Sequence, residues 1–160
     1  ERSETVKAIL SVIAIASTAI AGCATTQASA SRTPTDLATV ENACAYVPDE
    51  LRDGLLFGEH FEIASARVVH QRVGKQNVRR YVGAELFVPS KPGVSASHVA
   101  QAAQCQLARY ATEGRAEDRD PLAVRGASVS VKERGTGFVV RITSPDRDAA
   151  KAIAERSVSL

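Results

Sequence analysis

The order of strand-like and helix-like segments is the feature that most constrains the fold of this chain. Two stretches, 61–88 and 124–142, each hold a pair of segments rich in Val and other strand-forming residues, joined by a glycine-containing turn. A segment with helical spacing of apolar residues follows each pair, over 95–112 and from Ser144 onward. The sequence therefore predicts two successive strand–strand–helix units.

The alternation of apolar and polar residues indicates which side of each strand is buried. The side chains expected to face the core are Val82, Ala84, Leu86, Val88, Ala127, Val129, Val131, Phe138, Val140 and Ile142. The side chains expected on the opposite face include Tyr81, Glu85, Phe87, Lys132 and Arg141. One face of the sheet is thus apolar and the other is mixed.

Helical patterns complete the predicted fold. Residues 36–47 favour a short N-terminal helix that Asp36 can cap, and the helix over 95–112 begins at Ser95 or Ser97. Ser144 is the expected cap of the last helix, with Pro145 in its first turn. We therefore expect an α+β fold. It has a four-stranded antiparallel sheet, two helices on one face, and the short N-terminal helix at a side or end.

The composition is that of one globular domain. The chain has 160 residues, of which 44% are hydrophobic and 4% aromatic, and its formal net charge is +2. A charge this small does not favour a nucleic-acid partner. The composition also excludes collagen-like and wholly disordered chains.

An uncharged, mostly apolar run at 8–22 follows Lys7 and ends in small residues before Cys23. A charged start, a short apolar run and a small-residue end are typical of a secretory signal peptide. As a helix the run is about 22 Å long, which is shorter than the roughly 30 Å hydrocarbon core of a bilayer. We therefore expect export rather than an uncleaved membrane span.

The end of this run, Ile20-Ala21-Gly22-Cys23, resembles the lipobox of bacterial lipoproteins. The resemblance implies that the Cys23 thiol receives a diacylglyceryl group, that cleavage occurs before it, and that the new amino group is acylated, with palmitate as the expected chain. Two or more acyl chains hold a protein stably on a membrane. In enterobacterial lipoproteins an Asp after the Cys signals retention in the inner membrane. Ala24 stands there in this chain, so we expect an outer-membrane anchor that faces the periplasm.

These features divide the chain into three parts. Residues 1–22 are the predicted signal peptide, 23–35 a flexible tether of small and polar residues, and 36–160 a single domain. Because the chain contains no Met, we expect the natural start of the precursor to lie before Glu1.

Two cysteines, Cys44 and Cys105, remain after the lipobox. An even pair in an exported chain predicts a disulfide, because the compartment is oxidising. The helical spacing places Cys105 on the flank of its helix away from the apolar stripe, together with His98 and Arg109. We expect those two side chains to face solvent and the disulfide to hold the N-terminal helix against this flank.

A copper or zinc site is the alternative use of these residues. His98 lies seven residues before Cys105, on the same side of a helix, and a thiolate with imidazoles suits either metal. His60 and His70 are further candidate ligands in this alternative. The sequence has no CxxC, HxxxH or CxxH spacing, so we favour the disulfide.

Charge is uneven along the domain. Residues 41–62 hold six acidic side chains and the single cation Arg52, whereas 67–91 hold six cations and the single acid Glu85. The basic segment suits anionic lipid headgroups or another acidic polymer. The alternative is a solvated hairpin that neutralises the acidic segment beside it.

The sheet face away from the helices is the candidate binding surface, and we expect it to carry Tyr81, Phe87, Lys132 and Arg141. Aromatic and cationic side chains on an open sheet resemble single-stranded RNA platforms. Export separates the protein from RNA, so we expect no nucleic-acid partner and propose an envelope protein or a cell-wall ligand instead. Alternatively, the N-terminal segment of the same chain packs on this face and covers it.

Catalytic signatures such as G-x-S-x-G, S-x-x-K, H-E-x-x-H and the P-loop are absent from the sequence. We therefore expect neither catalysis nor a cofactor. Our interpretation is a lipid-anchored envelope protein with a small binding or scaffolding domain. A periplasmic copper- or zinc-binding protein that uses His98 and Cys105 is the alternative, and a hydrolase with an unrecognised site is a third possibility.

Overall fold

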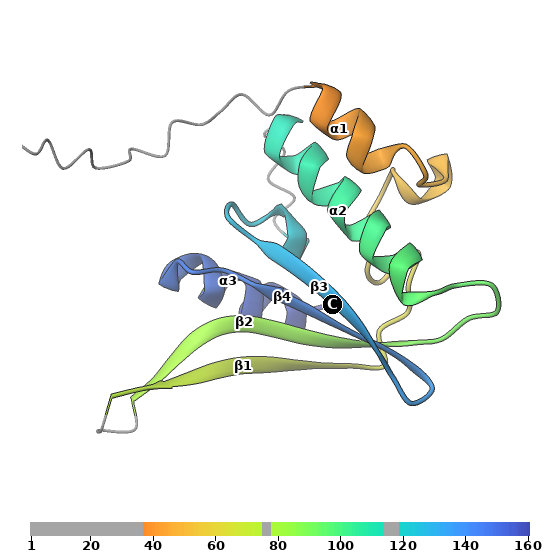
Figure 1. Ribbon diagram of the computed structural model, residues 1–160. Helices are drawn as coiled ribbons and strands as arrows, with labels where there is room; N and C mark the ends of the chain where they lie inside the picture. The colour runs from red at the N-terminus through yellow and green to blue at the C-terminus, as the bar shows by residue number, and fades with distance from the viewer. Residues whose placement is uncertain (1–36, 75–77, 114–118) are drawn as a thin grey trace, which may run out of the picture. The chain divides into compact units, whose positions relative to one another are not determined.

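The computed structural model describes residues 37–74, 78–113 and 119–160, which belong to one compact unit (Figure 1). The predicted signal peptide, Cys23, the tether and the Asp36 cap lie outside the described residues. The elements in chain order are α1 (Leu37–Cys44), η1 (Asp49–Leu51), β1 (Ser65–Val73), β2 (Val78–Pro89), α2 (Ala96–Glu113), η2 (Pro121–Ala123), β3 (Ser128–Arg134), β4 (Gly137–Thr143) and α3 (Arg147–Val158).

The four strands form one sheet in the order β1-β2-β4-β3, and every neighbouring pair is antiparallel. The predicted α+β fold, with two strand–strand–helix units and a short N-terminal helix, is confirmed. β1 and β3 begin four residues later than predicted, at Ser65 and Ser128. Phe61 belongs instead to a buried turn, where its main-chain N–H donates to the carbonyl of Leu56 at 2.9 Å.

The core lies on one face of the sheet. Six of the seven inward residues that alternation predicted in the two central strands are at most 4% exposed: Ala84, Leu86, Val88, Phe138, Val140 and Ile142. The seventh, Val82, is only partly buried. Val99 of α2 and Ile153 of α3 belong to the same buried cluster, so both helices cover this face. α2 packs over β3, and α3 packs over β1 and β2. The cluster is formed by residues between 44 and 153, so a fragment that begins at residue 24 contains the whole of this core, and we expect it to fold by itself.

The starts of the two long helices differ in how well they were predicted. Ser95 caps α2 as expected, because its hydroxyl accepts a hydrogen bond from the main-chain N–H of His98 at 3.2 Å. The predicted cap of α3 at Ser144 is wrong. Asp146 caps that helix, and its carboxylate accepts from the N–H of Ala149 at 2.8 Å. Ser144 is buried and accepts from the N–H of Asp146, so it shapes the turn before the cap.

A β-bulge in β2 shifts the alternation of its side chains. β1 pairs Val69 with Gly83 and His70 with Tyr81, so Val82 is the extra residue on β2. Gly83 is required at this place, because its φ is 148° and a Cβ there would lie 2.0 Å from the carbonyl oxygen of Ile142.

The bulge moves Tyr81 to the other face of the sheet. Tyr81 lies opposite His70, which shares a face with Ala66 on the core side of β1, and the two rings contact each other with centroids 4.8 Å apart. The prediction that Tyr81 shares a face with Phe87 is therefore wrong.

The outer end of the β1–β2 hairpin extends beyond the four-stranded sheet. β4 pairs with β2 from Gly83 onward, so residues 78–81 of β2 pair only with residues 70–73 of β1. We call these two segments the ribbon, and Figure 1 shows it projecting past the end of β4.

The predicted disulfide is confirmed. Cys44, the last residue of α1, is bonded to Cys105 of α2, with their Cα atoms 4.8 Å apart, and the side chain of Cys105 is fully buried. α1 packs along α2 on the flank that the sheet does not cover. Cys105 is buried on this flank because α1 lies over it, as predicted.

Polar side chains hold the segment after α1 to the same flank. Arg52 donates to the carbonyls of Val47 and Cys44 at 2.9 and 3.0 Å and so caps the end of α1. The buried amide of Gln106 donates to the carbonyls of Arg52 and Gly54 at 3.3 and 3.1 Å. Arg109 also donates to the carbonyl of Arg52, so it is a structural contact rather than the solvent-facing residue predicted.

We predict that removing the disulfide destabilises the domain without changing its fold. The bonded cysteines are 61 residues apart, and closing a loop of this length lowers the conformational entropy of the unfolded chain. In the entropy model this raises the free energy of unfolding by about 4 kcal/mol. In urea unfolding of residues 24–160, the Cys44→Ser/Cys105→Ser variant should have a free energy of unfolding lower than that of the wild type by this amount. A reductant should lower the stability of the wild type and leave the variant unchanged. Equal stability of wild type and variant would contradict the prediction.

Candidate functional site

The sheet face away from α2 and α3 is the candidate site. The register places its side chains in rows across the four strands. One row consists of Ser65, Phe87, Val139 and Lys132, and the next consists of Arg67, Glu85, Arg141 and Ser130. We call these eight residues the open face. Each of them is exposed or partly exposed, because both long helices pack on the opposite side.

Three of the four residues predicted for this surface lie on it. Phe87, Lys132 and Arg141 belong to the open face, whereas Tyr81 lies on the helix side beyond the bulge. The alternation also placed Glu85 on this face, but it did not show which residues of the other strands are its neighbours, because the sequence does not specify the register.

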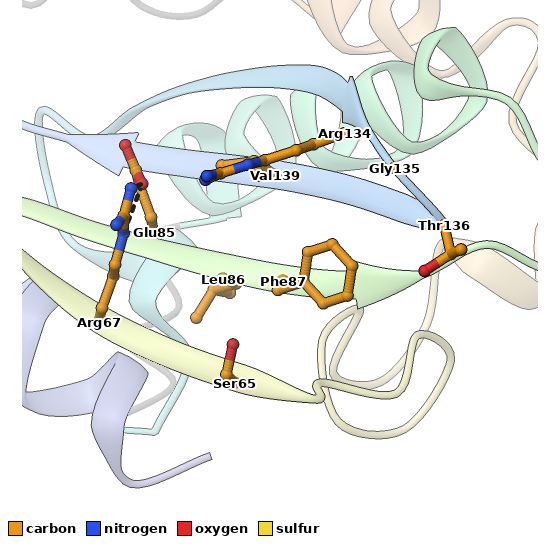
Figure 2. A pocket seen from close by; sticks show the side chains of 9 residues that line it. All are labelled: Ser65, Arg67, Glu85, Leu86, Phe87, Arg134, Gly135, Thr136 and Val139. Carbon is orange, nitrogen blue, oxygen red and sulfur yellow. Dashed lines mark hydrogen bonds and ion pairs between the residues drawn. The ribbon is translucent and has the colours of Figure 1, made fainter.

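An open pocket of about 340 Å³ lies on this face (Figure 2). It is lined by Ser65, Arg67, Glu85, Leu86, Phe87, Arg134, Gly135, Thr136 and Val139. Figure 2 shows a charged end at Arg67 and Glu85 and another end formed by the ring of Phe87 beside Thr136. The pocket therefore offers both ionic and apolar contacts to a ligand.

The charged end is built around the carboxylate of Glu85, whose side chain is 14% exposed. Arg67 donates to Oε2 of Glu85 from Nε at 2.8 Å and also from Nη2. The Nε of Arg141 lies 3.9 Å from Oε1 of the same carboxylate. One carboxylate is therefore close to two guanidinium groups, so this part of the face carries a net positive charge.

Arg134 adds a further positive charge to the pocket. Its side chain makes no ion pair or hydrogen bond with any residue in the described part of the chain, and it lies at the end of β3. In Figure 2 its side chain runs from the β3–β4 turn past Val139 toward the Arg67–Glu85 pair. The charged end of the pocket therefore suits an anionic group.

The apolar end depends on a glycine of β4. A Cβ on Gly137 would lie 2.9 Å from Cζ of Phe87 and 2.3 Å from the carbonyl oxygen of Val88. The absence of a side chain at Gly137 therefore leaves room for the ring of Phe87 to lie across this strand, beside Val139.

The residues of the metal alternative are not brought together. The sulfur of Cys105 is bonded to that of Cys44, so it has no thiolate to offer a metal. His60 contacts the carbonyl of Asp53 through Nε2 at 2.7 Å, and His70 lies against Tyr81. Among the described residues, no three His, Cys, Asp or Glu side chains are arranged to hold a metal ion.

A buried carboxylate, that of Asp120, lies outside the open face. Asp120 is 2% exposed and caps η2, accepting from the N–H of Leu122 at 2.8 Å. The hydroxyl of Tyr110 donates to its other oxygen at 2.8 Å, and Arg156 of α3 donates to its main-chain carbonyl at 3.0 Å. Asp120 thus connects α2, η2 and α3, which gives it a structural role.

Comparisons with family models, curated proteins and solved structures find no match to this chain. In the part of the chain that the structure describes, no helix has both the length and the apolar character needed to cross a membrane.

We predict that Arg67 and Glu85 stabilise the domain together. Because Glu85 is mostly buried and accepts two hydrogen bonds from Arg67, a double-mutant cycle with Arg67→Gln and Glu85→Gln should give a coupling of about 1 kcal/mol. The comparison is Lys151 and Glu155, an exposed pair on α3 at 3.6 Å, for which the coupling should be below about 0.5 kcal/mol. Equal couplings at the two pairs would mean that the open-face pair is an ordinary surface contact.

Proposed function

We propose that this chain is a lipid-anchored protein of the bacterial cell envelope whose folded domain binds another envelope component through the open face. The acylated residue is Cys23, and the domain faces the periplasm from the outer membrane. The observation that carries the binding part is the pocket on the open face, with its charged and apolar ends.

Export is supported by two independent features. Residues 7–23 combine a cation, an apolar run and a sequence that resembles a lipobox. The Cys44–Cys105 disulfide is of a kind that persists in oxidising compartments and is rare in the cytosol.

The chemistry of the pocket indicates the class of ligand. Arg67, Arg134 and Arg141 outnumber the one carboxylate of Glu85, so an acidic group is favoured at this end. Phe87 and Val139 lie beside it and favour a small apolar group on the same ligand. An acidic side chain or terminal carboxylate of an envelope protein, next to an apolar residue, meets both requirements.

The anchoring part predicts that Cys23→Ala releases the protein or leaves its signal uncut. The full precursor would be produced in a bacterial host with an outer membrane, and the mature N-terminus would be identified by mass spectrometry of the membrane fraction. The Cys44→Ser/Cys105→Ser variant is the matched control, and it should stay acylated and membrane-bound. If Cys23→Ala is processed and retained on the membrane like the wild type, the lipoprotein proposal is wrong.

The binding part predicts a partner contact that is confined to the open face. A photo-crosslinking residue placed at the exposed position of Lys132 in cells should give a discrete adduct, whereas the same residue at Lys151 on α3 should not. Arg134→Glu should abolish the adduct, because it reverses a charge in the pocket. Adducts of equal yield at both positions, or an adduct that is insensitive to Arg134→Glu, would rule out this face as the specific site.

A further inference from the structure

The end of the ribbon combines two features that a solvated hairpin does not need. Val73 and Val78 lie directly opposite each other, and they remain 47% and 56% exposed. The next pair is Arg72 opposite Arg79, two like charges in a position where they repel each other. An exposed apolar pair and a repulsive cationic pair therefore occupy adjacent positions near the end of the ribbon, on its two opposite faces.

The rest of the domain does not neutralise these cations. Arg72 and Arg79 make no ion pair with any residue that the structure describes, whereas Arg67 pairs with Glu85 within the sheet. Arg80, the next residue along β2, donates to the carbonyl of Pro145 at 2.8 Å and so contacts no carboxylate there.

The acidic segment lies at the other end of the sheet. Its last residues lead directly into Ser65, where β1 begins, and the N–H of Ala64 donates to the carbonyl of Phe87 at 2.9 Å. Two of its acids are already paired, Asp49 with Arg52 and Asp53 with Arg109. Lys91, the last cation of the basic segment, contacts the carbonyl of His60 beside the acidic segment, whereas the cations of the ribbon lie at the other end of the strands.

We propose that the ribbon end, residues 72, 73, 78 and 79, contacts the surface of a bilayer that contains anionic lipids. The arginines pair with lipid phosphates at the headgroup level, and the two valines enter the boundary between headgroups and acyl chains. The occupant is a membrane because the ribbon end offers positive charge on one face and exposed apolar surface on the other, and a bilayer that the strands approach end-on contacts both faces. A dissolved acidic polymer would use the charge alone.

This contact goes beyond the proposed anchor and does not depend on Cys23. The test therefore uses oxidised residues 24–160, which contain the whole described core and no acylated residue. Sedimentation is measured with vesicles of phosphatidylcholine alone and of phosphatidylcholine with phosphatidylglycerol. The wild type should bind the anionic vesicles and not the neutral ones, and added salt should weaken the binding.

Two variants separate the contributions of charge and apolar surface. Arg72→Gln/Arg79→Gln should lower the partition coefficient by at least about tenfold, because two of the cations at the surface are lost. Val73→Ser/Val78→Ser should lower it by several-fold at unchanged charge. The matched control, Arg119→Gln/Arg125→Gln, removes the same charge from exposed positions outside the ribbon and the open face, and it should bind like the wild type. Thermal unfolding of each variant verifies that it is folded.

Three results would overturn the proposal. One is equal binding of the Arg72→Gln/Arg79→Gln variant and the control. Another is binding to soluble polyphosphate, lost in the arginine variant, without binding to vesicles, which would assign the ribbon end to a dissolved polyanion. The third is a dimer in light scattering that dissociates in the valine variant, with no vesicle binding, which would assign it to a second copy of the chain. None of these results bears on acylation of Cys23, which is tested separately in cells.

Discussion

The disulfide between Cys44 and Cys105 determines how the parts of the domain outside the sheet are arranged. It fixes the end of α1 against the flank of α2 that faces away from the strands, and Arg52 and Gln106 hold the following segment on that flank. A short helix of eight residues has little stability of its own, so it depends on this attachment. Because α1 is held behind α2, it is not available to cover the other side of the sheet.

The open face follows from that arrangement. A sheet with helices on one side only leaves a second face to solvent or to a partner. Here that face carries Phe87 and Val139 beside Arg67, Glu85 and Arg141, which is an amphipathic surface rather than a uniformly polar one. The partial burial of Glu85 between two guanidinium groups fixes the positions of those cations, so the pocket next to them is preformed in the described structure.

The sequence predicted the parts of the fold that depend on local periodicity. Alternation placed Leu86, Val140 and their neighbours on the core side, because the pleat of a strand directs successive side chains to opposite faces. Tyr81 was misplaced because a bulge breaks that period, although a glycine inside a strand, Gly83, is a known sign of one. Asp146 was missed as a cap because Ser144 and Pro145 form an equally plausible start two residues earlier.

The candidate site was less predictable, because it depends on register. Arg67 and Glu85 are 18 residues apart, and only the pairing of β1 with β2 makes them neighbours. Arg134, the last residue of the edge strand β3, lines the pocket as well, although β4 lies between β3 and β2. Sequence alone placed Phe87, Glu85, Lys132 and Arg141 on this face, because they lie on strands with clear alternation, but it did not predict that Glu85 pairs with Arg67.

The segregation of charge along the sheet makes the two proposed contacts compatible. The cationic ribbon end and the acidic segment lie at opposite ends of the strands, so an anionic surface attracts the former and repels the latter. A domain that touches a bilayer with the ribbon end has its strands directed toward the membrane, and the faces of its sheet then point sideways. The open face, which runs parallel to the strands, is in that orientation accessible to a neighbouring envelope protein. The same strand that extends into the ribbon, β2, also carries Glu85 and Phe87, so one element positions both contacts.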